Sequence, residues 1–363
     1  MDHLTFLQLI FVCDFFNFMM ILFVILLSFV WAQEKLPVEI TLGGEVDFYF
    51  EASQSPSSKA GQTASEFSRL ELLPTLKMDE QVSFHFRFDL AEERSTTQPG
   101  YQSKTENAYL EWKPQENPNI THQLGLIRPA WRTRESVIAD FDNFGDSSKN
   151  LSRRYNFLSD GDLGYQGLWQ RKENHLVAFG LLNGEENKTA EIGPSKEVFT
   201  GYFFEDQSSL WSAWLSYGRV DQVEDRFSER VRAMLRHQKQ WGRFRLGLEF
   251  LWAQDSNADY EALKRGEGMT FTELSDPRAI STQASRIEIY YTLNPLQQFL
   301  IRYDDLQTEI SGKDLHSVML AWIKSEPRLF DWGFFYENTL FGPAHSAQSR
   351  QIERLCIGLS KVF

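Results

Sequence analysis

Polar and apolar residues alternate along this chain with a period of two over many short segments. The segment 82–90, VSFHFRFDL, is the clearest case, because valine, phenylalanine and leucine occupy every second position and polar residues fill the positions between. A β-strand points successive side chains to opposite faces, so the pattern predicts a strand with one apolar and one polar face. About sixteen such segments start near residues 38, 67, 82, 105, 120, 162, 174, 198, 209, 228, 242, 284, 297, 314, 328 and 351.

The connectors between these segments are alternately short and long. Turn-forming residues mark short connectors at 114–118, 294–295 and 326–327. Longer polar connectors are expected at 52–66, 91–104, 130–160, 184–197, 253–281 and 338–350. Hairpins with tight turns at one end and long loops at the other are typical of a membrane barrel. We therefore predict an all-β fold, a transmembrane antiparallel β-barrel of about sixteen strands that occupies residues 33–363.

A soluble sandwich or propeller would also alternate. Two features favour the membrane barrel instead. The apolar faces are densely aromatic, and aromatic residues make up 14% of the chain, while the opposite faces carry charges in mid-strand. Large aromatic side chains also recur near predicted strand ends, as a membrane–water interface requires. They are Trp112, Trp252, Tyr303, Trp322 and Tyr336.

The N-terminus predicts export. Residues 18–31 are apolar apart from Ser28, and a small residue, Ala32, follows at the position expected for cleavage. A short apolar core with a small residue at the cut is typical of a signal peptide, which we place at residues 1–32. The missing basic residue before the core is atypical. A transmembrane anchor is the alternative, although the run is short for a full span and no basic cluster follows it.

Charge and cysteine content narrow the function further. The formal net charge is −13, which argues against a general nucleic-acid binder. Cys13 would leave with the signal peptide, so Cys356 would be the only remaining thiol and no internal disulfide could form.

The chain ends on an alternating segment, ERLCIGLSKVF, at residues 353–363. We expect this last strand to close the barrel against the first one. A terminal phenylalanine, here Phe363, resembles the C-terminal signal of outer-membrane proteins. This resemblance implies the barrel-assembly machinery as a partner and the cell outer membrane as the location.

Charges on the polar faces would line the lumen, because a barrel of this size encloses an aqueous channel unless it is plugged. A basic wall opposite a more acidic wall would set a transverse field that favours dipolar solutes over apolar ones. The alternative is that these charges pair with their neighbours. The candidate pore-lining residues are Arg232, Arg236, Arg243, Arg245, Arg286 and Arg302 on the basic wall, and Glu45, Asp47, Glu71 and Asp89, with Arg69 and Arg87 among them, on the acidic wall.

The connector around 130–160 contains too many aromatic residues for an ordinary surface loop. We interpret it as a constriction loop that folds into the barrel and uses aromatics such as Trp131 as anchors. A structured extracellular loop over the barrel mouth is the alternative. The candidate residues of the constriction loop are Arg132, Arg134, Asp140, Asp142, Asp146, Arg153 and Arg154.

The stretches LSRRYNFLSDGDLGYQGLW (151–169) and FGLLNGEENK (179–188) resemble the phosphate-selective porin O and P family of Gram-negative outer membranes. The resemblance implies a sixteen-strand trimeric porin whose inward loop and basic lumen residues, Arg153 and Arg154 among them, favour anions. This lumen is rich in arginine but poor in lysine, and the whole chain is acidic. The sequence therefore predicts a porin, but these departures do not support phosphate specificity.

We expect passive diffusion of small hydrophilic solutes or inorganic anions through a homotrimer embedded in outer-membrane lipid, with no cofactor and no metal. The alternative is a non-conducting surface or adhesive barrel. We expect no enzymatic activity, because the histidines lie on widely separated segments and G-x-S-x-G, H-E-x-x-H and C-x-x-C motifs do not occur.

Overall fold

The structure is a computed structural model, and it describes ten parts of the chain. These are residues 39–54, 62–94, 99–131, 161–183, 196–221, 227–255, 280–309, 314–325, 331–341 and 351–362. Within them the chain forms sixteen strands: β1 (Glu39–Gln54), β2 (Gln62–Lys77), β3 (Val82–Arg94), β4 (Pro99–Trp112), β5 (Ile120–Ile127), β6 (Asp162–Lys172), β7 (His175–Leu182), β8 (Lys196–Glu205), β9 (Ser209–Asp221), β10 (Phe227–Trp241), β11 (Phe244–Asp255), β12 (Ile280–Asn294), β13 (Gln297–Thr308), β14 (Leu315–Lys324), β15 (Asp331–Phe341) and β16 (Gln351–Val362).

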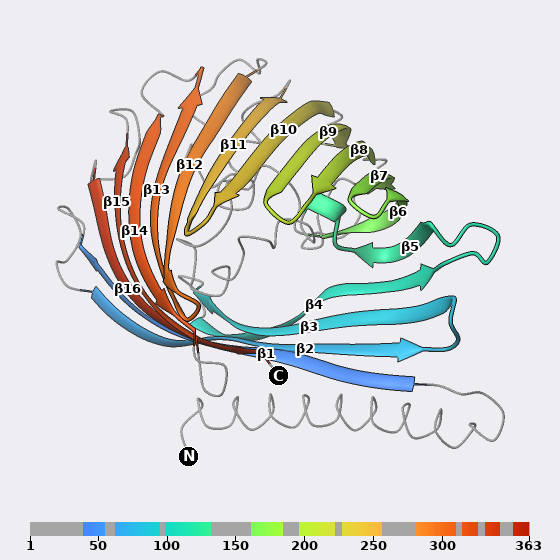
Figure 1. The fold of residues 1–363 in the computed structure, drawn as a ribbon, viewed down its shortest axis with the longest axis horizontal. Helices are drawn as coiled ribbons and strands as arrows, with labels where there is room; N and C mark the ends of the chain where they lie inside the picture. The colour runs from blue at the N-terminus through green and yellow to red at the C-terminus, as the bar shows by residue number, and fades with distance from the viewer. Residues whose placement is uncertain are drawn as a thin grey trace.

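The sixteen strands form one closed barrel (Figure 1). Each strand pairs with its neighbours in sequence, every pair is antiparallel, and β1 pairs with both β2 and β16. The closing pair runs from Glu45 opposite Val362 to Gln54 opposite Glu353. Closure removes the unpaired strand edges that an open sheet would leave. The expectation that the last strand closes the barrel against the first is confirmed.

The described short connectors all follow an even-numbered strand and therefore lie at one end of the barrel, which we call the short-turn end. They are residues 78–81, 113–119, 173–174, 206–208, 242–243 and 295–296. The two-residue turn between β10 and β11 contains Gly242 with a φ of 56°. A residue with a side chain adopts that left-handed conformation at a cost, so glycine suits this turn.

The predicted fold class, an all-β antiparallel barrel, is confirmed, and most strands start within a few residues of their predicted positions. The long connectors expected at 52–66 and 91–104 were wrong. β1 extends to Gln54 and β2 starts at Gln62, while β3 extends to Arg94 and β4 starts at Pro99. Backbone groups make the ladder hydrogen bonds, so pairing continues into polar sequence where apolar alternation has already stopped. The predicted signal peptide and Phe363 lie outside the described residues.

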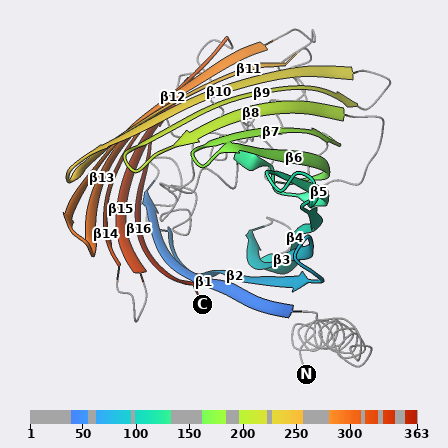
Figure 2. The ribbon, with the colours of Figure 1, turned by 45° about the vertical axis from the view of Figure 1, so that its right-hand side comes forward.

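Ala130 and Trp131 follow β5 and begin a helical turn. This turn lies on the inner side of the barrel wall (Figure 2). Among the residues that the structure describes, no helix has both the length and the apolar character to cross a membrane.

Candidate functional site: the inner wall of the barrel

The two faces of the barrel wall reverse the polarity of a soluble protein. On β13, the outward Phe299 and Ile301 are 43% and 53% exposed, whereas the inward Arg302 and Asp304 are 2% and 0% exposed. Large apolar side chains are exposed on the outside of the other strands too, among them Val198, Leu215, Leu235, Phe250, Ile287, Leu320, Phe334 and Ile357. An apolar outer surface around buried charges is the organisation of a barrel whose surroundings are lipid.

A row of inward charges crosses β10 to β13. Arg236 lies opposite Glu249, and Glu249 lies opposite Arg286. Arg286 in turn lies opposite Asp304. Residues directly opposite each other on an antiparallel pair share a face, so the four side chains form one line whose charges alternate in sign. Opposite charges in this register stabilise the sheet.

A second row lies next to the first, where Glu288 faces Arg302. Arg286, Glu288, Arg302 and Asp304 thus form a square of alternating charges, which we call the charge checkerboard. The Arg286 guanidinium binds Asp304 through Nε–Oδ1 at 2.7 Å and Nη2–Oδ2 at 3.0 Å. Its Nη1 lies 3.5 Å from Glu288 Oε1, and Arg302 Nε lies 3.5 Å from Asp304 Oδ2. All four side chains are at least nine-tenths buried, so a loss of any one leaves a charge uncompensated.

Hydroxyl groups on β12 and on the neighbouring strands β14 and β15 donate to buried carboxylates. The Tyr290 hydroxyl donates to Glu288 Oε2 at 3.3 Å. On β14 and β15, Ser317 Oγ donates to Glu337 Oε1 at 2.7 Å, and Thr339 Oγ1 donates to Ser317 Oγ at 3.2 Å. Buried carboxylates need such donors, because water does not reach them.

An aromatic anchor lies inside the barrel on the wall formed by β5 to β9. The Trp131 ring meets Trp214 edge-on, with centroids 4.1 Å apart, and meets Phe199 at 5.4 Å. A Cβ atom on Gly201 would lie 2.2 Å from the Trp214 ring, so glycine lets this ring lie directly against the strand backbone. Trp131 itself is only 1% exposed. The first residues of the predicted constriction loop are therefore packed against the inner wall.

Gln166 on β6 fixes the same segment through hydrogen bonds. Its Oε1 accepts from the backbone N–H of Ala130 at 3.1 Å, and its Nε2 donates to the backbone carbonyl of Arg128 at 3.1 Å. Nε2 also donates to Gln123 Oε1, and Gln123 Nε2 donates to Glu111 Oε2 at 2.9 Å. One buried amide side chain thus connects the backbone after β5 to polar residues on two strands.

The predicted basic wall is present, but it is interleaved with acids. Three arginines of the predicted basic wall are buried on the inner face and belong to the two charge rows: Arg236 on β10, Arg286 on β12 and Arg302 on β13. Arg87 on β3 is buried on the inner face as well. Arg232 is also buried there, and its Nη1 donates to the backbone carbonyls of Val231 and Gln254 at 3.1 and 3.3 Å. The alternative that charges pair with neighbours therefore applies to Arg286 and Arg302.

Arg243 and Arg245 differ from each other. Arg245 is half-buried on β11 and lies 5.7 Å from the ring of Tyr290. Arg243 was expected on the polar strand face, and this was wrong. It is exposed in the turn after Gly242, because β10 ends at Trp241 and β11 begins only at Phe244.

Several candidate residues have side chains outside the described part. Glu45, Asp47, Arg69, Glu71 and Asp89 lie on strands β1 to β3, and only their backbone is described. Register pairs Glu45 with Glu71 and Glu71 with Asp89, so these three positions share a face. The constriction-loop residues Arg132, Arg134, Asp140, Asp142, Asp146, Arg153 and Arg154 lie wholly outside the described residues.

Sequence reasoning missed the acids that accompany the arginines, namely Glu249, Glu288 and Asp304. It also missed Gln166, because an amide in a strand gives no sequence signal of a backbone contact 36 residues away. The acids could have been found by aligning hairpins about their turns, since a tight turn sets the register of the two strands that it joins.

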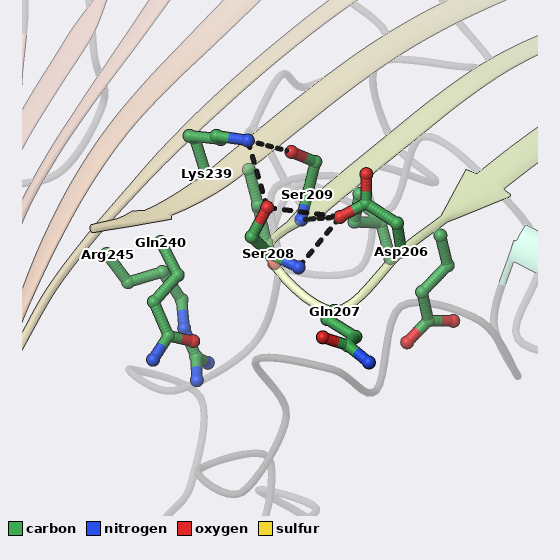
Figure 3. A pocket seen from close by; sticks show the side chains of 10 residues that line it. Asp206, Gln207, Ser208, Ser209, Lys239, Gln240 and Arg245 are labelled. Carbon is green, nitrogen blue, oxygen red and sulfur yellow. Dashed lines mark hydrogen bonds between the residues drawn. The ribbon is translucent and has the colours of Figure 1, made fainter. Parts of the chain in front are cut away.

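A small polar cavity of about 50 Å³ lies at the short-turn end, between the 206–208 turn and the ends of β10 and β11 (Figure 3). Asp206 Oδ1 accepts from the backbone N–H groups of Ser208 and Ser209, both at 2.7 Å. Lys239 Nζ donates to the two serine hydroxyls at 2.9 and 2.7 Å. The cavity holds a few water molecules at most, and its side chains mainly fix the turn.

The sequence matches no protein-family model and no curated protein. Solved structures do match. The anion-selective porin from Comamonas acidovorans has a TM-score of 0.67 and 11% identity, over 90% of this chain and 100% of that one. The outer membrane channel DcaP of Acinetobacter baumannii gives 0.64 and 10%, over 90% and 97%. OmpT of Vibrio cholerae in its trimer form gives 0.60 and 11%, over 89% and 99%. The chain has the fold of the outer-membrane porins.

The inner wall of this chain is characterised by the paired charges of β10 to β13 and by the aromatic anchor. Both follow from its own residues, since the identities above are too low to transfer side-chain roles.

Proposed function

We propose that this chain is a porin of the cell outer membrane, through which small hydrophilic solutes or inorganic ions diffuse passively. The observation that carries the proposal is the reversed polarity of the wall. Ile301 faces outward and is half exposed, while the neighbouring Arg302 faces inward among other charges. An apolar exterior requires lipid, and a charged interior suits water and ions rather than apolar solutes.

Selectivity in this proposal is weak. Among the described residues, the buried charged side chains of the inner face comprise six arginines and six carboxylates. Because positive and negative side chains are balanced, the inner wall carries little net charge. Arg286 already binds Asp304, so its charge is largely neutralised. A preference for anions is the finer hypothesis, supported by the fold shared with an anion-selective porin. Phosphate specificity is not part of the proposal.

The further elements of the proposal are export by residues 1–32, assembly through the terminal Phe363 and a homotrimer. The trimer is supported by the match to a porin described in a trimer form. The protein would act as a channel and not as an enzyme.

Planar-bilayer conductance of the folded, heat-modifiable protein tests the function. Stepwise openings are expected, and their reversal potential in a salt gradient gives the sign of the selectivity. A heat-unfolded sample is the control, and it should give no openings. Folded protein that never conducts would contradict the porin proposal and favour the non-conducting surface barrel.

A further inference from the structure

The histidines of the barrel fall into two groups. Four of the five histidines in the described residues lie on the outer face against exposed aromatic side chains. His237 stacks on Trp211 at 3.7 Å, and His122 stacks on Trp112 at 5.2 Å. The other two outward contacts are His175 with Tyr202 and His316 with Tyr303. The fifth, His85 on β3, has different surroundings.

His85 faces the lumen. Its ring stacks on Tyr109 of β4, with centroids 4.9 Å apart and the planes 17° from parallel. Tyr109 packs against the inner-wall cluster that contains Trp131, so both rings lie inside the barrel. The β3 strand begins at Val82, so His85 is its fourth residue. It therefore lies close to the 78–81 connector, near the short-turn mouth.

Both ring nitrogens of His85 have hydroxyl partners. Nδ1 lies 3.3 Å from Thr75 Oγ1 on β2, and Nε2 lies 2.9 Å from Ser83 Oγ. A hydroxyl either donates or accepts a hydrogen bond. The neutral ring can donate to one hydroxyl and accept from the other, and the imidazolium can donate to both. The ring can therefore gain a proton with no more than the rotation of one hydroxyl hydrogen.

The charged groups around His85 oppose one another. Burial of the ring opposes its ionisation most strongly, Glu111 on β4 favours the imidazolium, and Lys113 disfavours it. The side chains of Glu111 and Lys113 lie 3.1 Å apart. Lys77 of β2 lies opposite Ser83, and Arg87 follows on the inner face of β3. Among the described residues, the titratable Tyr109 also packs against the ring. Because the fixed charges around His85 include both signs, they largely offset each other. Protonation of His85 then changes the net charge at this mouth by one unit.

We propose that His85 is a selectivity-determining residue of the pore, whose protonation in mildly acidic medium adds a positive charge to the short-turn mouth and favours inorganic anions. The inference rests on the porin function proposed above. Histidine is the side chain that normally changes charge in this pH range, and in this barrel the outward histidines face away from permeating ions.

The test compares reversal potentials in a potassium chloride gradient at about pH 8 and about pH 5, which bracket histidine ionisation. Unmodified protein should shift toward anion selectivity at the lower pH. His85→Asn should lose that shift, with His85→Gln as a second variant if the first folds poorly. The matched control, His237→Asn, removes an outward histidine and should keep the shift. A full shift retained in both His85 variants would overturn the inference.

Failure of the inference is distinguishable from failure of the porin proposal. Unmodified protein that opens channels with no pH-dependent shift contradicts only the role of His85. Protein without channels contradicts the porin function, and an NMR titration of the imidazole ring then decides about His85. A ring that keeps one protonation state between about pH 5 and about pH 8 overturns the inference as well.

Discussion

The guanidinium of Arg286 and the carboxylate of Asp304 form a two-point ion pair on adjacent strands, with N–O distances of 2.7 and 3.0 Å and both side chains almost completely buried. Two parallel N–H···O bonds fix both the distance and the orientation of the groups. The pair lies at the centre of the charge checkerboard, so Asp304 also compensates part of the charge of Arg302. Ion pairs between inward side chains thereby stabilise this part of the inner wall.

We expect Asp304→Asn to destabilise the barrel by about 3 kcal/mol, because removal of one partner leaves a buried arginine charge uncompensated. The variant should also shift the pore toward anions, since one negative charge is lost from the inner wall. Urea unfolding in lipid vesicles measures the first effect, and the reversal potential measures the second.

The matched control for Asp304 is Glu116→Gln, which removes a carboxylate that is exposed in the 113–119 turn. It should change the free energy of unfolding by less than about 0.5 kcal/mol. Equal effects of the two substitutions would show that the checkerboard contributes nothing specific. The double variant Arg286→Met with Asp304→Leu should recover most of the lost stability, because no charge is then left unpaired.

A charged substitution on the outer face should lower the stability of the barrel by an amount that depends on its depth in the membrane. Ile301 lies between Phe299 and Tyr303 on the outward face of β13, in the middle of its apolar stretch. Ile301→Arg should destabilise the barrel in a bilayer by about 2 to 4 kcal/mol, because the charge would lie near the centre of the hydrocarbon. Unfolding in lipid vesicles measures this.

The control for depth is Gln297→Arg, at the start of the same strand. Near the interface the cost should fall to about 0 to 1 kcal/mol. If both variants were equally stable, the outward face of β13 would not lie against lipid, and the membrane assignment of this wall would fail.

Alternation was sufficient to predict the strands, because the side-chain period of a strand is visible in segments such as 82–90. Residue pairs on the two strands of one hairpin could also have been predicted from the sequence. Arg236 and Glu249 are equally distant from the two-residue turn at Gly242, so the turn alone places them opposite each other. Arg286 and Asp304 are joined by another short turn, although an irregularity between Thr292 and Asn294 shifts the count by one.

Pairs across long connectors could not be predicted in the same way. Glu249 meets Arg286 across the connector 256–279, whose length sets no register. The aromatic content around 130–160 indicated that Trp131 is an anchor, but its partners Phe199 and Trp214 lie on strands far along the chain. The prediction placed Arg243 wrongly, because a polar residue is expected both in a turn and on an inward strand face, and the sequence pattern does not separate the two.

The 206–208 turn predicts a pH dependence. The backbone amide of Ser208, together with that of Ser209 and the Ser208 hydroxyl, holds the pKa of Asp206 below its usual value. A carboxylate whose folded-state pKa is lowered stabilises the protein above its unfolded pKa, and this contribution disappears as the pH falls through the folded pKa. Asp206→Ala should therefore unfold more easily than the unmodified protein at neutral pH, and the difference should shrink in strong acid.

Unfolding curves of the two proteins across this pH range measure the difference. Asp206→Asn is the informative control, because its amide oxygen still accepts from Ser208 and Ser209 but carries no charge. It should lie between the two and show no titration from this position. A pH-independent gap between Asp206→Ala and the unmodified protein would mean that the charge of Asp206 is irrelevant to the turn.

The aromatic anchor gives the last prediction. Trp131 is almost fully buried against Phe199 and Trp214, so Trp131→Ala leaves a large cavity on the inner wall and should cost about 3 to 5 kcal/mol of stability. If residues 130–160 narrow the pore, as the sequence predicts, release of their first anchored residue should also raise the single-channel conductance. Thermal unfolding and bilayer recordings measure the two effects separately.

The control for the anchor is Trp241→Ala, which removes a tryptophan of the same size that is 54% exposed at the end of β10. It leaves no interior cavity and should alter neither the conductance nor the stability to a comparable extent. A stability loss for Trp131→Ala with unchanged conductance would separate the two roles. The residue would then hold the segment after β5 against the inner wall without holding a constriction, and the strand side chains alone would set the path of ions through the pore.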